Sequence, residues 1–201
     1  MLALSLLLNA AVAAAAVAQP GPADPNPADV RAGAYKVDPN HTQVTFGVSH
    51  MGFAQYRGRF SGVEGVLRID PRRVAVTQLE VTIPTASVST TSDKLDGELK
   101  SPQWLDAGRF PQMRFRSTRV TPTGPGRARV EGELTLHGVT RPVTLQARFV
   151  GAGIDPIDKA YTVGFEATGE LSRSAFGVKT YAPLIGDAVT LTLAGAFEAA
   201  P

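Results

Sequence analysis

The feature that most constrains this chain is an apolar residue at every second position, repeated in eight stretches between residues 44 and 198. A period of two is the β-strand period, because successive side chains of a strand point to opposite faces. The eight stretches are 44–50, 63–69, 79–83, 113–116, 130–136, 143–149, 161–171 and 189–198. Eight half-apolar strands with short connections favour an all-β sandwich or barrel. We expect an eight-stranded antiparallel up-and-down barrel, because closure leaves no exposed sheet edge.

One stretch departs from this period. Thr91, Ser92 and Asp93 are residue types preferred at a helix N-cap, and Leu95 and Leu99 follow one helical turn apart. A Ser-Pro pair then opens a second short turn. We expect one or two short helices between the third and fourth strands, covering one end of the β-structure.

The composition excludes several classes of function. The 201 residues suffice for one domain with its own core. The absence of cysteine excludes disulfides, thiolate nucleophiles and zinc–cysteine sites. A net charge of +2 is too small for the concentrated basic surface that binds nucleic acid, so no nucleic-acid partner is expected.

The N-terminal residues predict export. Residues 1–18 form an apolar run that ends in Ala-Val-Ala, the small-residue pattern of a signal-peptidase site. The run is short and rich in alanine for a membrane anchor, the alternative interpretation. Residues 19–33 are crowded with Pro, Ala and Asp and predict a flexible lead-in. We therefore expect export with a cleaved signal peptide, and a barrel domain over residues 34–199.

A catalytic or metal site is hard to assemble from this sequence. It contains no nucleophile elbow, no H-E-x-x-H and no phosphate-binding loop. Of its three histidines, His41 lies in a predicted turn and His137 on a polar strand face. Because a metal site needs three or four convergent ligands, none is expected.

His50 and Arg173 each end the apolar face of a predicted strand. In a simple meander these two strands run in the same direction, so both residues would lie at one rim of the barrel. Two donors at the mouth of an apolar interior would suit the polar head of a long amphiphile. A buried histidine satisfied by a backbone carbonyl is the alternative for His50, and a one-residue bulge would turn either side chain outward.

The inward positions of the predicted strands would line a channel for the apolar tail. They are Phe46, Val48, Phe115, Leu134, Val163, Phe165 and Leu191. Six arginines between residues 109 and 129 mostly alternate with apolar residues and indicate a solvated face. Attraction to an anionic membrane surface is the functional alternative for these arginines.

Four segments of the chain, in order, resemble the YceI-like family. They are YKVDPNHTQVTFGVSHMGFAQYRGRFSGVEGVL, LKSPQWLDAGRFPQMRFRS, GELTLHGVTRPVTL, and the closing pair LSRSAFGV and IGDAVTLTL. The resemblance extends from about Tyr35 to Glu198. It implies an exported, lipocalin-like barrel that binds polyisoprenoids, such as isoprenoid quinones or polyprenyl phosphates, with no general catalytic activity.

By this resemblance His50, Arg173 and Phe176 lie near the ligand cavity, and Trp104 stands where the family more often has Phe. Two positions depart from the family pattern. Ala175 replaces a residue that is often acidic, which removes a potential partner of Arg173. Thr42 stands where Ser is usual.

These observations predict a periplasmic protein that carries or sequesters a long-chain lipid. We expect no obligatory cofactor beyond a bound isoprenoid or ubiquinone-like lipid. Besides the lipid ligand, the partners considered are a second copy of the chain in a homodimer and the membrane surface in a transient contact. The alternatives are a hydrolase or transferase that uses His50 as general base on a bound lipid, and an interaction module whose barrel is filled by its own side chains.

Overall fold

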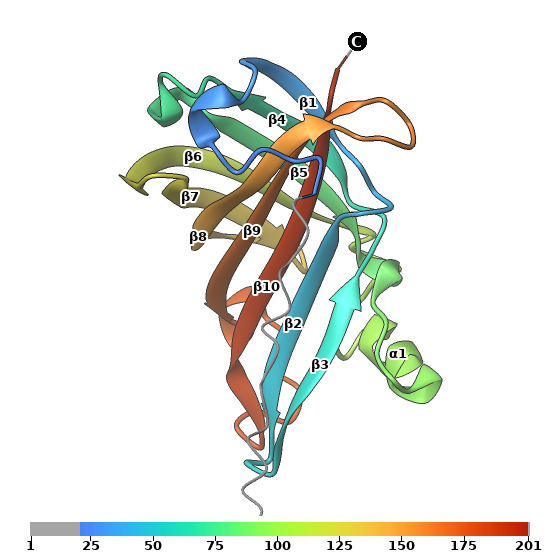
Figure 1. Cartoon of the computed structure of the whole chain (residues 1–201). Coiled ribbons are helices and arrows are strands. Elements are labelled where there is room, and N and C mark those ends of the chain that lie inside the picture. The colour runs from blue at the N-terminus through green and yellow to red at the C-terminus, as the bar shows by residue number, and fades with distance from the viewer. Residues whose placement is uncertain (1–20, 201) are drawn as a thin grey trace, which may run out of the picture.

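The computed structural model describes residues 21–200, in which strands predominate (Figure 1). The strands are β1 (Gly33–Val37), β2 (Gln43–His50), β3 (Ala54–Phe60), β4 (Glu64–Ile69), β5 (Gln78–Pro84), β6 (Gln112–Gly124), β7 (Arg127–Leu136), β8 (Val139–Ile154), β9 (Tyr161–Ser172) and β10 (Ile185–Ala199). The helices are α1 (Asp93–Lys100) and the 3-10 turns η1 (Pro27–Asp29), η2 (Val74–Val76), η3 (Thr85–Ser87) and η4 (Ser174–Phe176).

Eight of the strands form a closed antiparallel barrel, as the alternation predicted. Their order is β1-β4-β5-β6-β7-β8-β9-β10, and the pairing of β1 with β10 closes the ring. Consecutive strands from β4 to β10 are neighbours, so most of the barrel is a simple meander. The helix α1 lies in the connection between β5 and β6, the interval in which a helix was expected.

β2 and β3 are an additional hairpin on the same sheet. β10 is long enough to pair with β1 at residues 197–199 and with β2 at residues 185–194 (Figure 1). β3 pairs with β2, and Arg59 of β3 forms a bridge with Ser89 in the segment that precedes α1. The lower half of the barrel in Figure 1 is thus walled by β2, β3 and the residues around α1.

The sequence pattern identified β2 but missed β1 and β3. β1 has only five residues, and in β3 Gly58 interrupts the apolar face of Tyr56 and Phe60, although polar residues alternate with it. Thr42 occupies the break between β1 and β2. Its hydroxyl donates to the Ala196 carbonyl (3.2 Å) and accepts from the Ala196 N–H (3.1 Å), so it replaces a strand residue opposite β10.

α1 begins where the sequence indicated. The Ser92 side chain caps it by accepting from the N–H of Leu95 (3.4 Å), and the acids of its first turn suit the positive end of the helix dipole. The Ser-Pro pair that follows forms turns and no second α-helix. These turns place Trp104 in a small apolar cluster with Val178 and Ile185.

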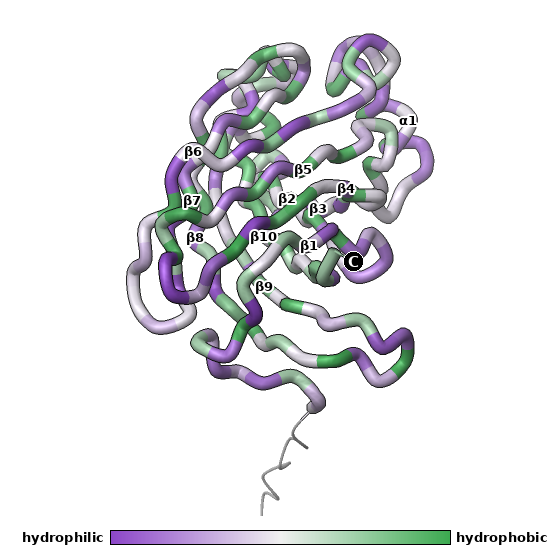
Figure 2. Tube along the Cα trace, turned by 90° about the horizontal axis from the view of Figure 1, so that it is seen from above, coloured by the Kyte–Doolittle hydropathy of each residue, from purple (hydrophilic) through white to green (hydrophobic). Residues whose placement is uncertain are grey.

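The core lies inside the barrel. Hydrophilic and hydrophobic residues alternate along the strands (Figure 2), and the inward members form one buried cluster. Tyr35 and Val163 are among its most deeply buried side chains. No helix within residues 21–200 is long and apolar enough to span a bilayer.

The lead-in was expected to be flexible, but its described residues contact the barrel. Asp24 forms a backbone bridge with Ala152 of β8, and Val30 is buried in the core. The Arg31 guanidinium stacks on the Tyr161 ring (4.1 Å), and the Arg31 carbonyl accepts from the Tyr35 hydroxyl (2.5 Å). The polar composition did not reveal these contacts, because one valine and backbone bonds supply most of them. The predicted signal peptide lies outside the described residues.

Candidate functional site

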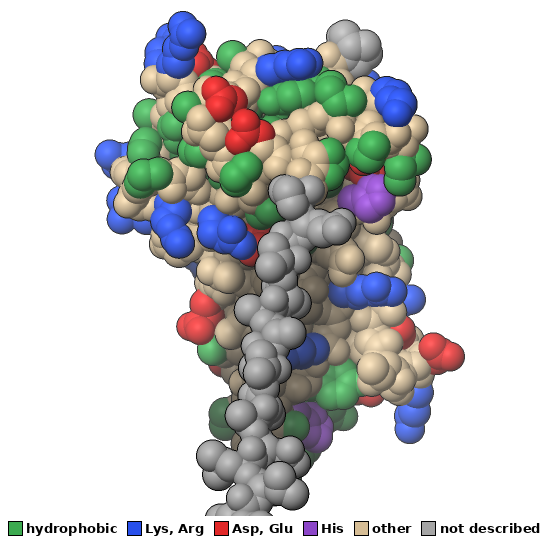
Figure 3. All heavy atoms as spheres, in the orientation of Figure 1, with side chains coloured by type: hydrophobic (Ala, Val, Ile, Leu, Met, Phe, Trp, Pro, Cys, Tyr) green, Lys and Arg blue, Asp and Glu red, His purple; other side chains and the backbone are tan. Residues whose placement is uncertain are grey.

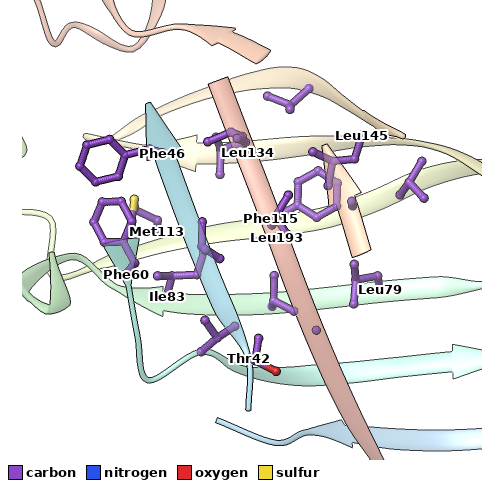
Figure 4. A pocket seen from close by; sticks show the side chains of 18 of the residues that line it. Thr42, Phe46, Phe60, Leu79, Ile83, Met113, Phe115, Leu134, Leu145 and Leu193 are labelled. Carbon is purple, nitrogen blue, oxygen red and sulfur yellow. The ribbon is translucent and has the colours of Figure 1, made fainter. Parts of the chain in front are cut away.

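The barrel encloses an elongated apolar cavity of about 310 Å³. Side chains from β1 to β10 and from the α1 segment line it. Figure 4 shows Phe46, Phe60, Met113, Phe115, Leu134 and Leu145 among them, converging from different strands. Polar side chains are few among the described residues of its wall, and Arg173 is the one buried charge there.

The cavity is narrow relative to its length. Ile185 and Phe197 both line it, and the path along β10 from one to the other is twelve residue steps, roughly 40 Å at 3.3 Å per residue. Val37 lies in the wall at the Phe197 end, and Trp104 and Arg173 at the other. A small volume spread over this length suits a linear chain better than a compact molecule.

Two aromatic residues of the wall lie across glycines of neighbouring strands. A Cβ on Gly58 of β3 would collide with the Phe46 ring, and one on Gly132 of β7 would collide with the Phe115 ring. The missing side chains let both rings lie close to the sheet. The lumen beside these rings is thereby kept open.

Arg173 closes one end of the cavity and is 5% exposed. Its Nε donates to the Gly186 carbonyl (2.8 Å), Nη1 to Val178 (2.9 Å) and Nη2 to Ile185 (2.7 Å). Burial lowers the pKa of the guanidinium, an effect that the Asp187 carboxylate opposes. Three carbonyl dipoles thus take the place of the acidic partner that Ala175 cannot supply.

Three hydrogen bonds use only part of the donor capacity of Arg173. A guanidinium has five N–H groups, so two are left without a partner among residues 21–200. The guanidinium also lies 5.5 Å from the centre of the Trp104 ring. The Trp104 indole donates to Glu98 of α1 (3.2 Å), which fixes the ring at this end of the cavity. The arrangement offers a cation and an aromatic face to a polar group there.

Most residues predicted to contact a ligand lie in the wall of this cavity. They are Phe46, Val48, Trp104, Phe115, Leu134, Phe165, Leu191 and Arg173. Val163 and Phe176 are buried but belong to the surrounding core and do not line the cavity. Phe176 lies in η4, and its carbonyl accepts from His137 Nδ1 (3.2 Å).

His50 differs from the expectation, because it is exposed and lies outside the cavity wall. Its side chain lies on the same face of β2 as that of Val48, as the alternation predicted. However, β10 has an irregularity between Ile185, which pairs with His50, and Val189, which pairs with Val48. The hairpin continues past the cavity at this point, so the last member of the apolar alternation emerges into solvent. The predicted pair of donors is reduced to Arg173.

The other two histidines have structural contacts. His41 forms an ion pair with Asp38, in the turn where it was expected. His137 and Gly138 form the two-residue turn between β7 and β8, and the His137 ring packs edge-on against Phe110 (4.9 Å). Residues 21–200 contain no group of three or more potential metal ligands.

Comparisons with known proteins agree on one family. The model of the YceI-like domain family matches residues 35–197. A UPF0312 protein of Pseudomonas fluorescens is 39% identical over 155 residues, covering 74% of this chain and 78% of the relative. A UPF0312 protein of Vibrio parahaemolyticus is 35% identical over 150 residues, covering 74% and 79%.

Solved structures share the fold at lower identity. BcnA of Burkholderia cenocepacia superimposes with a TM-score of 0.72 at 24% identity, covering 80% of this chain and 98% of BcnA. A domain from Saccharophagus degradans, described as polyisoprenoid binding, has a TM-score of 0.60 at 13% identity, covering 85% of this chain and all of that domain. At these identities the likeness concerns the fold.

Proposed function

This chain belongs to the YceI-like domain family, and we propose that its barrel binds a long-chain amphiphilic lipid, an isoprenoid quinone or polyprenyl phosphate by preference. The narrow apolar cavity along the barrel axis carries this proposal. Each methylene group that leaves water for such a lumen gains about 0.8 kcal/mol. The polyisoprenoid binding ascribed to the Saccharophagus degradans domain supports an isoprenoid as the ligand.

We place the polar head of the lipid at the Arg173 end. The two remaining N–H groups of Arg173 can donate to a carbonyl or phosphate oxygen, and the Trp104 ring can pack on a planar head group. Tail carbons would then contact Phe115, Leu134 and the residues beyond them. His50 lies outside the wall, so the head group depends on Arg173.

The biological role follows from a ligand that is nearly insoluble in water. The N-terminal export pattern favours a periplasmic protein that carries the lipid away from a membrane or sequesters it there. The alternative of an enzyme with His50 as general base requires His50 to reach a bound lipid. Nothing in the placement of His50 favours that reaction.

Trp104 supplies the test, because it is the single tryptophan of the chain and lines the cavity. Titration of delipidated protein with an isoprenoid quinone should quench its fluorescence at one quinone per chain. Ala167→Phe places a ring in the cavity and should abolish saturable quenching. Thr168→Phe adds the same bulk at the neighbouring exposed position and should leave the titration unchanged.

Absence of saturable quinone binding to the wild-type protein, measured both by quenching and by separation of bound from free quinone, would contradict the proposal. Equal titrations of the two phenylalanine variants would place the ligand outside the barrel, which contradicts it as well. A saturable complex without quenching, detected by separation of bound from free quinone, would overturn the proposed head-group orientation.

A further inference from the structure

Two loops at the Arg173 end of the barrel expose large apolar side chains. Met51 and Phe53 lie at the tip of the β2–β3 hairpin, and Tyr181 and Leu184 lie in the loop between η4 and β10. Phe53 is 87% exposed. Figure 1 shows both loops at the lower end of the molecule, and Figure 3 shows hydrophobic side chains beside a histidine there.

The two loops form one surface. The Met51 N–H donates to the Leu184 carbonyl (2.9 Å), and His50 pairs with Ile185. The Thr180 hydroxyl donates to the Gln103 carbonyl, so the second loop also rests on the α1 segment. We call Met51, Phe53, Tyr181 and Leu184 the apolar tip.

The apolar tip is continuous with the cavity. The Tyr181 ring lies 6.1 Å from the Trp104 ring, which lines the cavity. Ile185 also lines the cavity and directly follows Leu184 of the tip. A chain that leaves the cavity at the Arg173 end therefore meets apolar side chains and not bare polar surface.

The charge of these loops favours an anionic partner. Residues 49–63 and 173–186 contain arginine and lysine but no Asp or Glu, and Lys179 lies within the second loop. Asp187, which follows it, is bound by the Ser172 hydroxyl and the Ser174 N–H. Protruding apolar side chains with neighbouring cations are the arrangement by which proteins insert shallowly into anionic bilayers.

The opposite end of the barrel lacks this combination. Its β8–β9 loop exposes Ile157 by 90%, but Asp155 and Asp158 flank that residue. Carboxylates beside an exposed apolar residue are repelled by an anionic membrane surface. Exposed apolar residues and cations occur at both ends, as with Ile157 beside Lys159 and Val76 beside Arg73, but in the described chain only the loops of the apolar tip carry them without Asp or Glu.

We propose that the apolar tip docks this protein on an anionic lipid bilayer, with the Arg173 end of the cavity facing the membrane. The inference rests on the proposed function, because it makes the tip the place where the lipid ligand enters and leaves. Phe53 and Leu184 insert among the lipids, and Lys179 pairs with their phosphates.

Co-sedimentation with vesicles of phosphatidylcholine, with and without phosphatidylglycerol, tests the proposal. The Phe53→Asp/Leu184→Asp double variant should bind phosphatidylglycerol vesicles at least about tenfold more weakly than the wild type. Lys179→Gln should bind these vesicles about fivefold more weakly, and its binding should depend less on salt concentration than that of the wild type. Ile157→Asp is the matched control at the other end and should bind as the wild type does. Residues 1–20 are the same in every variant, so they do not affect the comparison.

Equal binding of the tip variant and the wild type, or no binding by either, would overturn the proposal. So would a wild-type dimer in light scattering that the tip variant dissociates, with no vesicle binding, since the tip would then be an interface between two copies. Extraction of lipid from the same preparations separates this proposal from the proposed function. Protein that carries lipid but does not bind vesicles would refute only the membrane docking. Protein that binds vesicles but carries no lipid would refute only the lipid ligand of the cavity.

Discussion

Arg173 is the residue on which the geometry of the cavity end depends. It holds the carbonyls of Val178, Ile185 and Gly186 together, and these belong to the loop and strand that close the barrel there. Sequence periodicity indicated an inward arginine that needs a partner. It could not identify backbone carbonyls as the partners, because carbonyls are present at every position and leave no mark in the sequence.

Replacement of Arg173 should therefore affect folding as well as binding. We expect Arg173→Met to lower the free energy of unfolding by about 3 kcal/mol, since buried carbonyls lose their donors. Urea denaturation measures this change. Arg119→Met is the control, because Arg119 is 72% exposed at 4.0 Å from Glu131, and its loss should cost less than about 0.5 kcal/mol. Equal losses for the two variants would contradict the role assigned to Arg173.

The Asp38–His41 pair makes stability depend on pH in a defined direction. Burial acts to raise the pKa of Asp38, but hydrogen bonds from His41 and from the Asn40 N–H outweigh it and hold the pKa below 3.8. The hydrogen bond to Asp38 raises the pKa of His41 above 6.5. The Asp38 contribution is present above 3.8 and lost as pH falls through its lowered pKa. The His41 contribution is present below 6.5 and lost as pH rises through its raised pKa.

His41→Gln should consequently destabilise the protein most between pH 3.8 and 6.5. The difference in unfolding free energy between variant and wild type, measured by urea denaturation across pH, should shrink at higher pH. A difference that is constant or that grows above neutral pH would show that the pair is not ionised as described.

At the scale of elements, the break between β1 and β2 is held by Thr42. Thr42→Val keeps the shape and removes the hydroxyl, so the Ala196 N–H loses its acceptor. We expect a loss of about 1–2 kcal/mol in unfolding free energy, measured by thermal or urea denaturation. Thr42→Ser keeps the hydroxyl and should retain most of the stability. If the valine and serine variants were equally stable, the hydroxyl would have no role in joining the strands.

Elements with a regular apolar face were predictable, and the others were not. The strands from β4 to β10, and β2, were predicted from alternation, and α1 from its Ser92 cap and leucine spacing. β1 is too short for a period to emerge. β3 owes its place to pairing with β2 and to the bridge between Arg59 and Ser89, which are tertiary contacts.

For the whole molecule, the middle of the cavity was predictable and its ends were not. Phe46, Phe115 and Leu191 line the lumen because the two-residue period holds along an intact strand. At the rim the period of β2 continues to His50, but His50 lies outside the cavity wall, where β10 has its irregularity. Bulges and loop lengths set where a barrel ends, and neither has a signature in the apolar pattern.

Native mass spectrometry of the protein purified without detergent tests whether the barrel holds one long-chain amphiphile. We expect a complex of one polypeptide with one lipid, whose released mass and fragments are those of an isoprenoid amphiphile. Ala167→Phe should be detected at the mass of the polypeptide without lipid, and Thr168→Phe at the mass of the complex. Bare polypeptide in the wild type, or lipid retained equally by Ala167→Phe, would contradict the binding of one lipid inside the barrel.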